Sequence, residues 1–147
     1  MGSGKTFLLG KVFKEYTSQI LHTNSFQVHD YYNIIRDYEL EGAVALKKYG
    51  HFKENQNGYQ KDHTRTVLID DFLSTKSTAS YYGNKTDIAD LLVSFRYEAY
   101  QRSRKLTHFT MNLYPGELQD ILDERSVSRL QEMCNIIPFE DCDWRKT

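Results

Sequence analysis

The residues best suited to chemistry stand at the start of the chain, where Gly2-Ser3-Gly4-Lys5-Thr6 has the form of the second half of a phosphate-binding loop. Such a loop reads G-x-x-x-x-G-K-[ST] and lies between a buried strand and a helix. Free backbone N–H groups at the helix N-terminus favour a bound anion, so Lys5 would reach terminal phosphates and the Thr6 hydroxyl would bind magnesium. The alternative is that Met1-Gly2-Ser3 is only a start residue followed by a linker.

An acidic pair, Asp70-Asp71, follows the apolar run Thr66-Val67-Leu68-Ile69. A continuous run of this kind is typical of a strand buried on both faces of a parallel sheet. Ligands of such sheets bind at the carboxyl ends of the strands. We therefore expect Asp70 to hold magnesium through a water molecule and Asp71 to orient or activate an attacking water. An ordinary acidic turn between strand and loop is the alternative.

Two further polar side chains are candidates for the same site. Asn112 ends the next expected strand, where its amide would touch a γ-phosphate or the attacking water. Spacing alone favours another interpretation, a turn-forming asparagine ahead of Pro115. Arg145 lies in a polar tail, and from its position alone it is a solvated side chain.

Arg125 and Arg129 stand four residues apart, which places both on one face of an expected helix. They would form surface ion pairs with Glu124 or Glu132, or present a guanidinium to the nucleotide of a neighbouring subunit. The sequence leaves both interpretations open.

The composition narrows the class of protein. With 147 residues the chain is expected to form one domain with a sizeable core. A net charge of −1 gives no basic signature from which nucleic-acid binding can be argued. No apolar stretch is long enough for a membrane span and no secretory signal is present, so we expect a cytoplasmic protein. Cys134 and Cys142 do not have the spacing of a metal or redox pair, and the scattered histidines predict no zinc site.

Hydrophobic periodicity predicts helices that alternate with strands, which favours a parallel sheet covered on both faces. Asp30 and Thr86 are the expected caps of two of the helices, and Arg96 is expected on or near an exposed helix face. Loops are expected over 50–65 and 73–85. The expected helices are 5–21, 31–41, 43–49, 86–105, 115–122 and 123–133, and the expected strands are 26–29, 66–69, 106–112 and 135–139.

In this order the motifs resemble the AAA+ ATPases of the bacterial helicase-loader group (DnaC/DnaI type), relatives of the IstB-like transposition ATPases. The stretch LTHFTMNLYPGEL, from Leu106 to Leu118, resembles the loaders' strand that ends in a sensor asparagine and leads into a helix. The stretch DERSVSRL, from Asp123 to Leu130, is similar to their G-E-R-x-x-x-R-[LM] element. Asn135-Ile-Ile-Pro-Phe matches the strand that follows, and Tyr82-Gly83-Asn84 resembles prophage-type members.

The resemblance implies a three-layer α/β P-loop fold that binds ATP and Mg²⁺ at a subunit interface and hydrolyses ATP slowly. It also implies a homo-oligomer, a replicative helicase as partner, and single-stranded DNA as a further contact. By matching position, it assigns a phosphate-loop role to Gly2, Ser3, Gly4, Lys5 and Thr6, the acidic-pair role to Asp70 and Asp71, and the first sensor role to Asn112. It makes Arg129, with Arg125 close by, the arginine finger that acts in trans, and Arg145 the second sensor.

The chain departs from this family at its start. The family's leading glycine and the strand that feeds the phosphate loop would precede Met1. That strand lies in the middle of the family's sheet, so we expect an unpaired gap between the strands at 106–112 and 135–139. We also expect the chain to be a truncated gene product or a fragment of a longer protein. The expected protein is thus one AAA+ domain over 1–147 without its first strand, an ATPase module of a helicase loader. A non-catalytic shortened interaction protein and a transposition helper ATPase are the alternatives.

Overall fold

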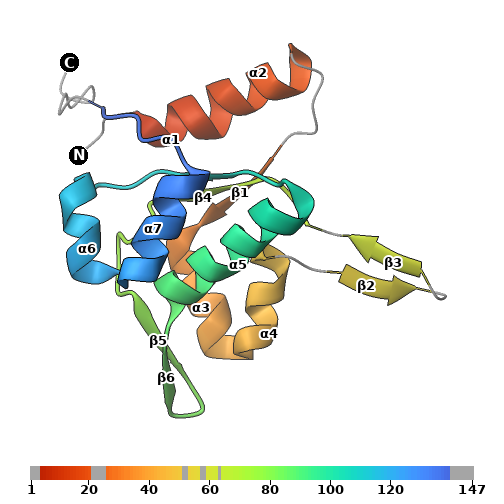
Figure 1. The fold of residues 1–147 in the computed structure, drawn as a ribbon, viewed down its shortest axis with the longest axis vertical. Coiled ribbons are helices and arrows are strands. Elements are labelled where there is room, and N and C mark those ends of the chain that lie inside the picture. The colour runs from red at the N-terminus through yellow and green to blue at the C-terminus, as the bar shows by residue number, and fades with distance from the viewer. Residues whose placement is uncertain (1–3, 21–25, 51–52, 57–58, 63, 140–147) are drawn as a thin grey trace.

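A three-stranded parallel sheet forms the centre of the fold (Figure 1). The computed structural model describes residues 4–20, 26–50, 53–56, 59–62 and 64–139. The strand order is β1-β4-β7, and helices flank the sheet. The strands are β1 (Gln27–Asp30), β4 (Val67–Asp70) and β7 (Thr107–Phe109).

The central strand β4 is apolar because both of its faces are covered. Val67, Leu68 and Ile69 are all buried, as the sequence predicts for a strand in the middle of a parallel sheet. In the register of the sheet, Ile69 lies between His29 of β1 and Phe109 of β7. Asp70 is the last residue of β4, so its carboxylate stands at the carboxyl edge of the sheet.

One face of the sheet packs against three main helices, α3 (Tyr31–Glu41), α5 (Ile88–Ser103) and α7 (Glu124–Met133). Each begins after an aspartate whose side chain accepts a hydrogen bond from a helix N–H: Asp30 from Asn33, Asp87 from Asp90 and Asp123 from Ser126. The core between these helices and the sheet contains Ile34, Ile35, Leu46, Val67, Ile69, Leu92, Val93, Val127 and Leu130. Shorter helical pieces complete this side: α4 (Ala43–Leu46), η2 (Lys47–Tyr49), η3 (Pro115–Glu117) and α6 (Leu118–Ile121).

The predicted cap of α5 is wrong by one residue. Asp87, not Thr86, caps this helix, because Asp87 Oδ1 lies 3.1 Å from the Asp90 nitrogen. Thr86 belongs instead to a strand, and its hydroxyl accepts a hydrogen bond from the Tyr38 hydroxyl at 2.8 Å.

The N-terminal helix covers the opposite face of the sheet (Figure 1). It runs from Lys5 to Gln19 as α1 (Lys5–Phe7), a π-helical turn η1 (Leu8–Phe13) and α2 (Lys14–Gln19). Its backbone approaches β4 closely, since a Cβ atom on Gly10 would lie 3.7 Å from Leu68. No side chain of this helix is fully buried, so the helix is held by few contacts.

Aromatic rings hold the helix against the end of the sheet. The Phe13 ring lies 5.9 Å from the Phe26 ring and 5.4 Å from the imidazole of His108, measured between ring centroids. Phe26 and His108 are themselves 5.2 Å apart. This three-ring contact joins the N-terminal helix to the segment before β1 and to β7.

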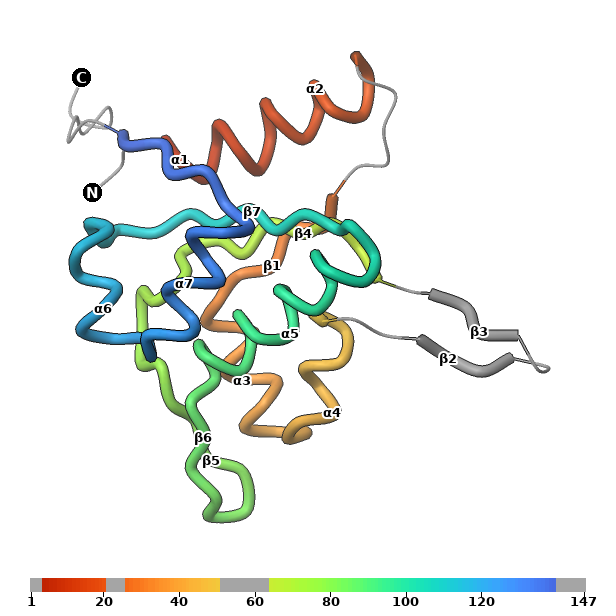
Figure 2. Tube along the Cα trace, viewed as in Figure 1, coloured from red at the N-terminus to blue at the C-terminus, as the bar shows by residue number. Residues whose placement is uncertain are grey.

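Two antiparallel hairpins occupy regions that the sequence analysis assigns to loops. They are β2 (Lys53–Gln56) with β3 (Tyr59–Asp62) (Figure 1), and β5 (Thr78–Tyr81) with β6 (Asn84–Asp87) (Figure 2). The turn of the second hairpin has positive φ at both central residues, Tyr82 (47°) and Gly83 (80°). That backbone pair is the one that two-residue hairpins favour, so the loop prediction over 73–85 overlooked a turn signal.

The strand predicted at 135–139 is wrong. Residues 134–139 form no strand, and the side chains of Ile136 and Ile137 are 60% and 72% exposed. A strand needs a neighbour to satisfy its backbone groups. Within the described residues β7 is an edge strand of the sheet, and the segment after α7 forms no backbone ladder with it.

A buried arginine joins the helical layer to the sheet, and its position corrects the expectation that Arg96 lies on an exposed face. The Arg96 side chain is 0% exposed. Its Nε donates to Thr107 Oγ1 at 2.8 Å, and its Nη1 donates to the carbonyl of Tyr49 at 2.9 Å. Its Nη2 donates to the carbonyls of Arg65 and Leu106 at 2.9 and 3.1 Å. Burial lowers the pKa of this guanidinium to about 10, so it stays charged at neutral pH.

Replacing Arg96 should destabilise the fold strongly. Arg96→Met removes four hydrogen bonds and strands buried acceptors, each of which costs about 1–3 kcal/mol, so we expect a loss of roughly 3 kcal/mol or more in the free energy of unfolding. Urea denaturation measures it. Arg102→Met is the matched control, because Arg102 is exposed and pairs only with Glu98 on the same helix, and it should lose less than about 0.5 kcal/mol. Equal losses in the two variants would contradict the role given to Arg96.

The aromatic contact under the N-terminal helix should make stability depend on pH. Burial lowers the pKa of His108 below its ordinary value of 6.5, so the unfolded chain binds the proton more readily than the folded chain. The contribution is therefore complete above pH 6.5 and is lost as the pH falls below it. We expect His108→Phe to show a shallower loss of stability between pH 7.5 and 5.5 than the unchanged chain, as measured by urea denaturation. A residual slope should remain from His29, whose pKa is also lowered by burial. An unchanged pH slope would show that His108 is not desolvated.

Candidate functional site

The candidate site is centred on a hydrogen bond between residues far apart in the sequence. The Thr6 hydroxyl donates to Asp70 Oδ1 at 3.0 Å, across 64 residues of chain. Thr6 lies in the first turn of the N-terminal helix, and Asp70 lies at the carboxyl end of β4. The two motifs that the sequence analysis joins by expectation, the Gly4-Lys5-Thr6 turn and the acidic pair, therefore lie next to each other.

Thr110 holds the same carboxylate from the other side, and the sequence analysis missed it. Its hydroxyl donates to Asp70 Oδ1 at 2.5 Å and accepts the backbone N–H of Asp71 at 2.8 Å. The Thr110 backbone is fixed by bonds from its N–H to the Ile69 carbonyl and from the Phe72 N–H to its own carbonyl. The available signal was its place just after β7, beside a strand expected to end in aspartate.

The backbone turns abruptly after Asp70. Asp71 has φ of 52° and Leu73 has φ of 61°, both in the left-handed region that side-chain-bearing residues seldom occupy. Aspartate tolerates this region better than most residues. The turn places the Asp71 side chain, which is partly exposed, beyond the sheet edge rather than in the core.

Gly4 and Lys5 open the helix that carries Thr6. Gly4 has φ of 74°, a left-handed conformation for which glycine has no steric cost. The first helical hydrogen bond runs from the Leu8 N–H to the Gly4 carbonyl at 2.8 Å. The N–H groups of Lys5, Thr6 and Phe7 therefore have no hydrogen-bond acceptor within the helix. They point outwards from the helix N-terminus, the positive end of the helix dipole. Gly2 and Ser3 lie outside the described residues.

Asn112 is not joined to the candidate site. It lies three residues after the end of β7, and its side chain is exposed. Within the described part of the chain, no hydrogen bond connects it to Asp70 or Asp71. Thr110, two residues earlier, occupies the position nearest the carboxylate. Arg145 falls outside the described residues.

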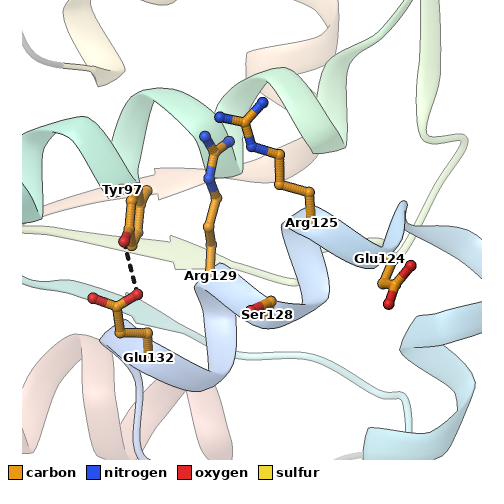
Figure 3. Close-up of a pocket in the computed structure, with 6 residues that line it drawn as sticks. All are labelled: Tyr97, Glu124, Arg125, Ser128, Arg129 and Glu132. Carbon is orange, nitrogen blue, oxygen red and sulfur yellow. Dashed lines mark hydrogen bonds between the residues drawn. The ribbon is translucent and has the colours of Figure 1, made fainter.

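Arg125 and Arg129 lie on α7 and line an open surface hollow with Tyr97, Glu124, Ser128 and Glu132 (Figure 3). Their guanidinium groups project from the same side of the helix, and Glu124 points away from them. The guanidinium carbon of Arg129 is 5.1 Å from the centre of the Tyr97 ring. In this structure neither expected surface ion pair forms: among the described residues, no carboxylate lies within ion-pair distance of either arginine.

The oxygen atoms around Asp70 fit a magnesium ion better than a transition metal. A threonine hydroxyl and a carboxylate are hard oxygen donors, and their 3.0 Å separation is close to the ~3 Å between neighbouring oxygens of an octahedral magnesium shell. Magnesium in phosphate sites takes only one or two protein ligands, and phosphate and water supply the rest. In the portion of the chain that the structure describes, no three His, Cys, Asp or Glu side chains gather as a metal-ligand cluster.

Comparison with protein-family models, with curated proteins and with solved structures found no match to this chain. None of the helices over the described residues has both the length and the apolar character that a membrane span requires.

The Thr110 hydroxyl should be necessary to hold the acidic pair. Thr110→Val keeps the shape of the side chain but removes the bond to Asp70 and leaves the Asp71 N–H without its acceptor. We expect a loss of about 1–3 kcal/mol in the free energy of unfolding, measured in urea. Thr110→Ser retains the hydroxyl and should lose much less. If serine and valine were equally destabilising, the methyl group and not the hydroxyl would be responsible.

Proposed function

We propose that this chain is a magnesium–ATP-binding module of the AAA+ P-loop type, with a three-layer α/β architecture. The observation that carries the proposal is the Thr6–Asp70 hydrogen bond at the carboxyl edge of the sheet. Phosphate loops and acidic pairs act together on one cation and one triphosphate, so their contact is what such a function requires. The order β1-β4-β7 also places the acidic-pair strand in the sheet centre, beside the strand assigned to the sensor.

Each residue of the candidate site has a role in this proposal. The N–H groups at the start of the helix and the Lys5 ammonium would bind the phosphates, because both favour an anion. Thr6 and Asp70 would hold Mg²⁺, which when bound neutralises phosphate charge. Asp71, partly exposed beyond β4, would orient or activate the attacking water. Thr110 would fix the carboxylate of Asp70.

The remaining roles follow from the helicase-loader resemblance. Arg129 would reach the γ-phosphate of a neighbouring copy, with Arg125 close by, and Asn112 and Arg145 would act as sensors. Asn112 would have to move towards the nucleotide, since its side chain is exposed and unconnected to Asp70. A replicative helicase and single-stranded DNA are the proposed partners, in a homo-oligomer in the cytoplasm. A transposition helper differs from this proposal in its partner rather than in its chemistry.

A second candidate function is a non-catalytic interaction protein. The observation in its favour is the exposed apolar surface of the N-terminal helix, where Phe7 and Tyr16 are 61% and 48% exposed. Side chains of this size commonly face a partner when several gather on one element. The experiment below separates the two functions, because a folded chain that binds no nucleotide supports the second.

Nucleotide affinity should depend on Lys5 and not on other lysines of the same helix. Removal of a charged hydrogen bond to phosphate costs about 2 kcal/mol, so Lys5→Ala should weaken Mg–ATP binding about thirtyfold in calorimetric titration. Lys11→Ala is the matched control, because Lys11 is an exposed lysine on a different face of the same helix from Lys5. Its ammonium lies over the Phe7 ring. Its affinity should stay within about twofold of the unchanged chain. Equal affinities for Lys5→Ala and the unchanged chain would reject the proposed phosphate loop.

A further inference from the structure

The hollow between α5 and α7 contains Arg129, and the acidic residue best placed to pair with it, Glu132, makes hydrogen bonds to other side chains instead (Figure 3). Glu132 stands three residues after Arg129 on α7, a spacing at which a helix usually pairs opposite charges. The pair is not formed. Instead the Arg129 guanidinium lies over the Tyr97 ring, 5.1 Å from its centroid.

Two side chains of α5 hold Glu132 away from Arg129. The Tyr97 hydroxyl donates to Glu132 Oε2 at 2.7 Å, and Gln101 Nε2 donates to Glu132 Oε1 at 2.9 Å. Gln101 also donates to the Tyr97 hydroxyl oxygen at 3.1 Å, so the three residues form a closed cluster. The hydrogen bond to Glu132 raises the pKa of Tyr97, which therefore remains a donor at neutral pH.

We propose that Tyr97, Gln101 and Glu132 are positioning residues that keep the Arg129 guanidinium unpaired for a phosphate group of a nucleotide held by a second copy of this chain. The inference rests on the proposed function for its partner, and on the contacts of α5 and α7 for its mechanism. The Tyr97 ring packs against the guanidinium, with its centroid 5.1 Å from the guanidinium carbon, and the two donors satisfy both oxygens of Glu132.

The chemistry of the hollow suits a phosphate. A planar guanidinium presents paired N–H donors that match phosphate oxygens, and a ring beneath it leaves those in-plane donors free. Arg125 projects from the same side of α7 and adds a second positive charge. The Tyr97 hydroxyl cluster lies to the side of the stacked guanidinium, so a phosphate would not have to displace it.

The test uses NMR of the full chain with ¹⁵N-labelled arginine, and it follows the Nε–H signals of Arg129 and Arg125 during titration with inorganic tripolyphosphate. Tyr97→Phe keeps the ring but frees one oxygen of Glu132, which can then pair with Arg129. We expect the affinity at Arg129 to fall about two- to fivefold, the competition that an exposed ion pair exerts. Arg125 lies in the same hollow and reports the same binding event, so Arg102, which is exposed on α5 and pairs with Glu98, is the control whose Nε–H signal should not shift.

Rescue distinguishes positioning from mere structural support. Adding Glu132→Gln to Tyr97→Phe removes the competing charge and should restore the tripolyphosphate affinity at Arg129. Gln101→Leu, on an exposed face of α5, is a second variant that frees the other Glu132 oxygen and should act like Tyr97→Phe. Unchanged affinity at Arg129 in both single variants, or failure of Glu132→Gln to rescue, would overturn the positioning role.

A mixed sample tests the second copy. Labelled Lys5→Ala chains, whose affinity should be about thirtyfold lower, are mixed with unlabelled unchanged chains at a Mg–ATP concentration that only the unchanged chains bind. An Arg129 shift that appears only in the mixture supports delivery by a second copy, and an equal shift in labelled Lys5→Ala alone would overturn it. Absence of ATP binding by the unchanged chain would reject the proposed function and the nucleotide partner together. The tripolyphosphate titration would still decide the positioning role by itself.

Discussion

The carboxylate of Asp70 is the point on which the arrangement of the molecule depends. One oxygen, Oδ1, accepts hydroxyl hydrogens from Thr6 of the N-terminal helix and from Thr110 after β7, at 3.0 and 2.5 Å. It thereby connects the layer above the sheet, the central strand and the edge strand at a single atom. Asp70 is only 9% exposed, and a buried carboxylate is tolerated when hydrogen bonds satisfy it. The cost of burying the carboxylate is offset by the two hydroxyl hydrogen bonds. The same bonds fix the positions of Thr6 and Thr110.

The fold could be predicted from the sequence where local rules and tertiary packing agree. The cap at Asp30, the helix after it and the buried strand before Asp70 all follow from capping and hydrophobic pattern, and the structure confirms them. Prediction failed where a partner decides the outcome. Residues 135–139 have strand composition but form no backbone ladder with the edge strand β7. Arg96 has the sequence position of a surface arginine, while its partners include carbonyls distant in sequence.

The candidate site shows the same division. The proximity of Thr6 and Asp70 was an expectation from motif order, and the structure places these two side chains in contact. Thr110 was missed because its place just after an expected strand is a weak signal, and its contact with Asp70 across the sheet is known only from the structure. The cluster of Tyr97, Gln101 and Glu132 was equally hidden, since Glu132 bonds to residues 35 and 31 positions earlier in the sequence, on another helix. Only helix packing brings those donors to one carboxylate.

The unequal anchoring of the two layers has a mechanical consequence. Arg96 fastens α5 to η2 and to the starts of β4 and β7 through four neutral oxygens, and lysine could not replace its planar fork. The N-terminal helix has no fully buried side chain and is attached by three rings and one hydroxyl bond. Local opening begins where buried contacts are fewest, so we expect the sheet edge near Asp70 to open by separation of the N-terminal helix before the layer held by Arg96 loosens.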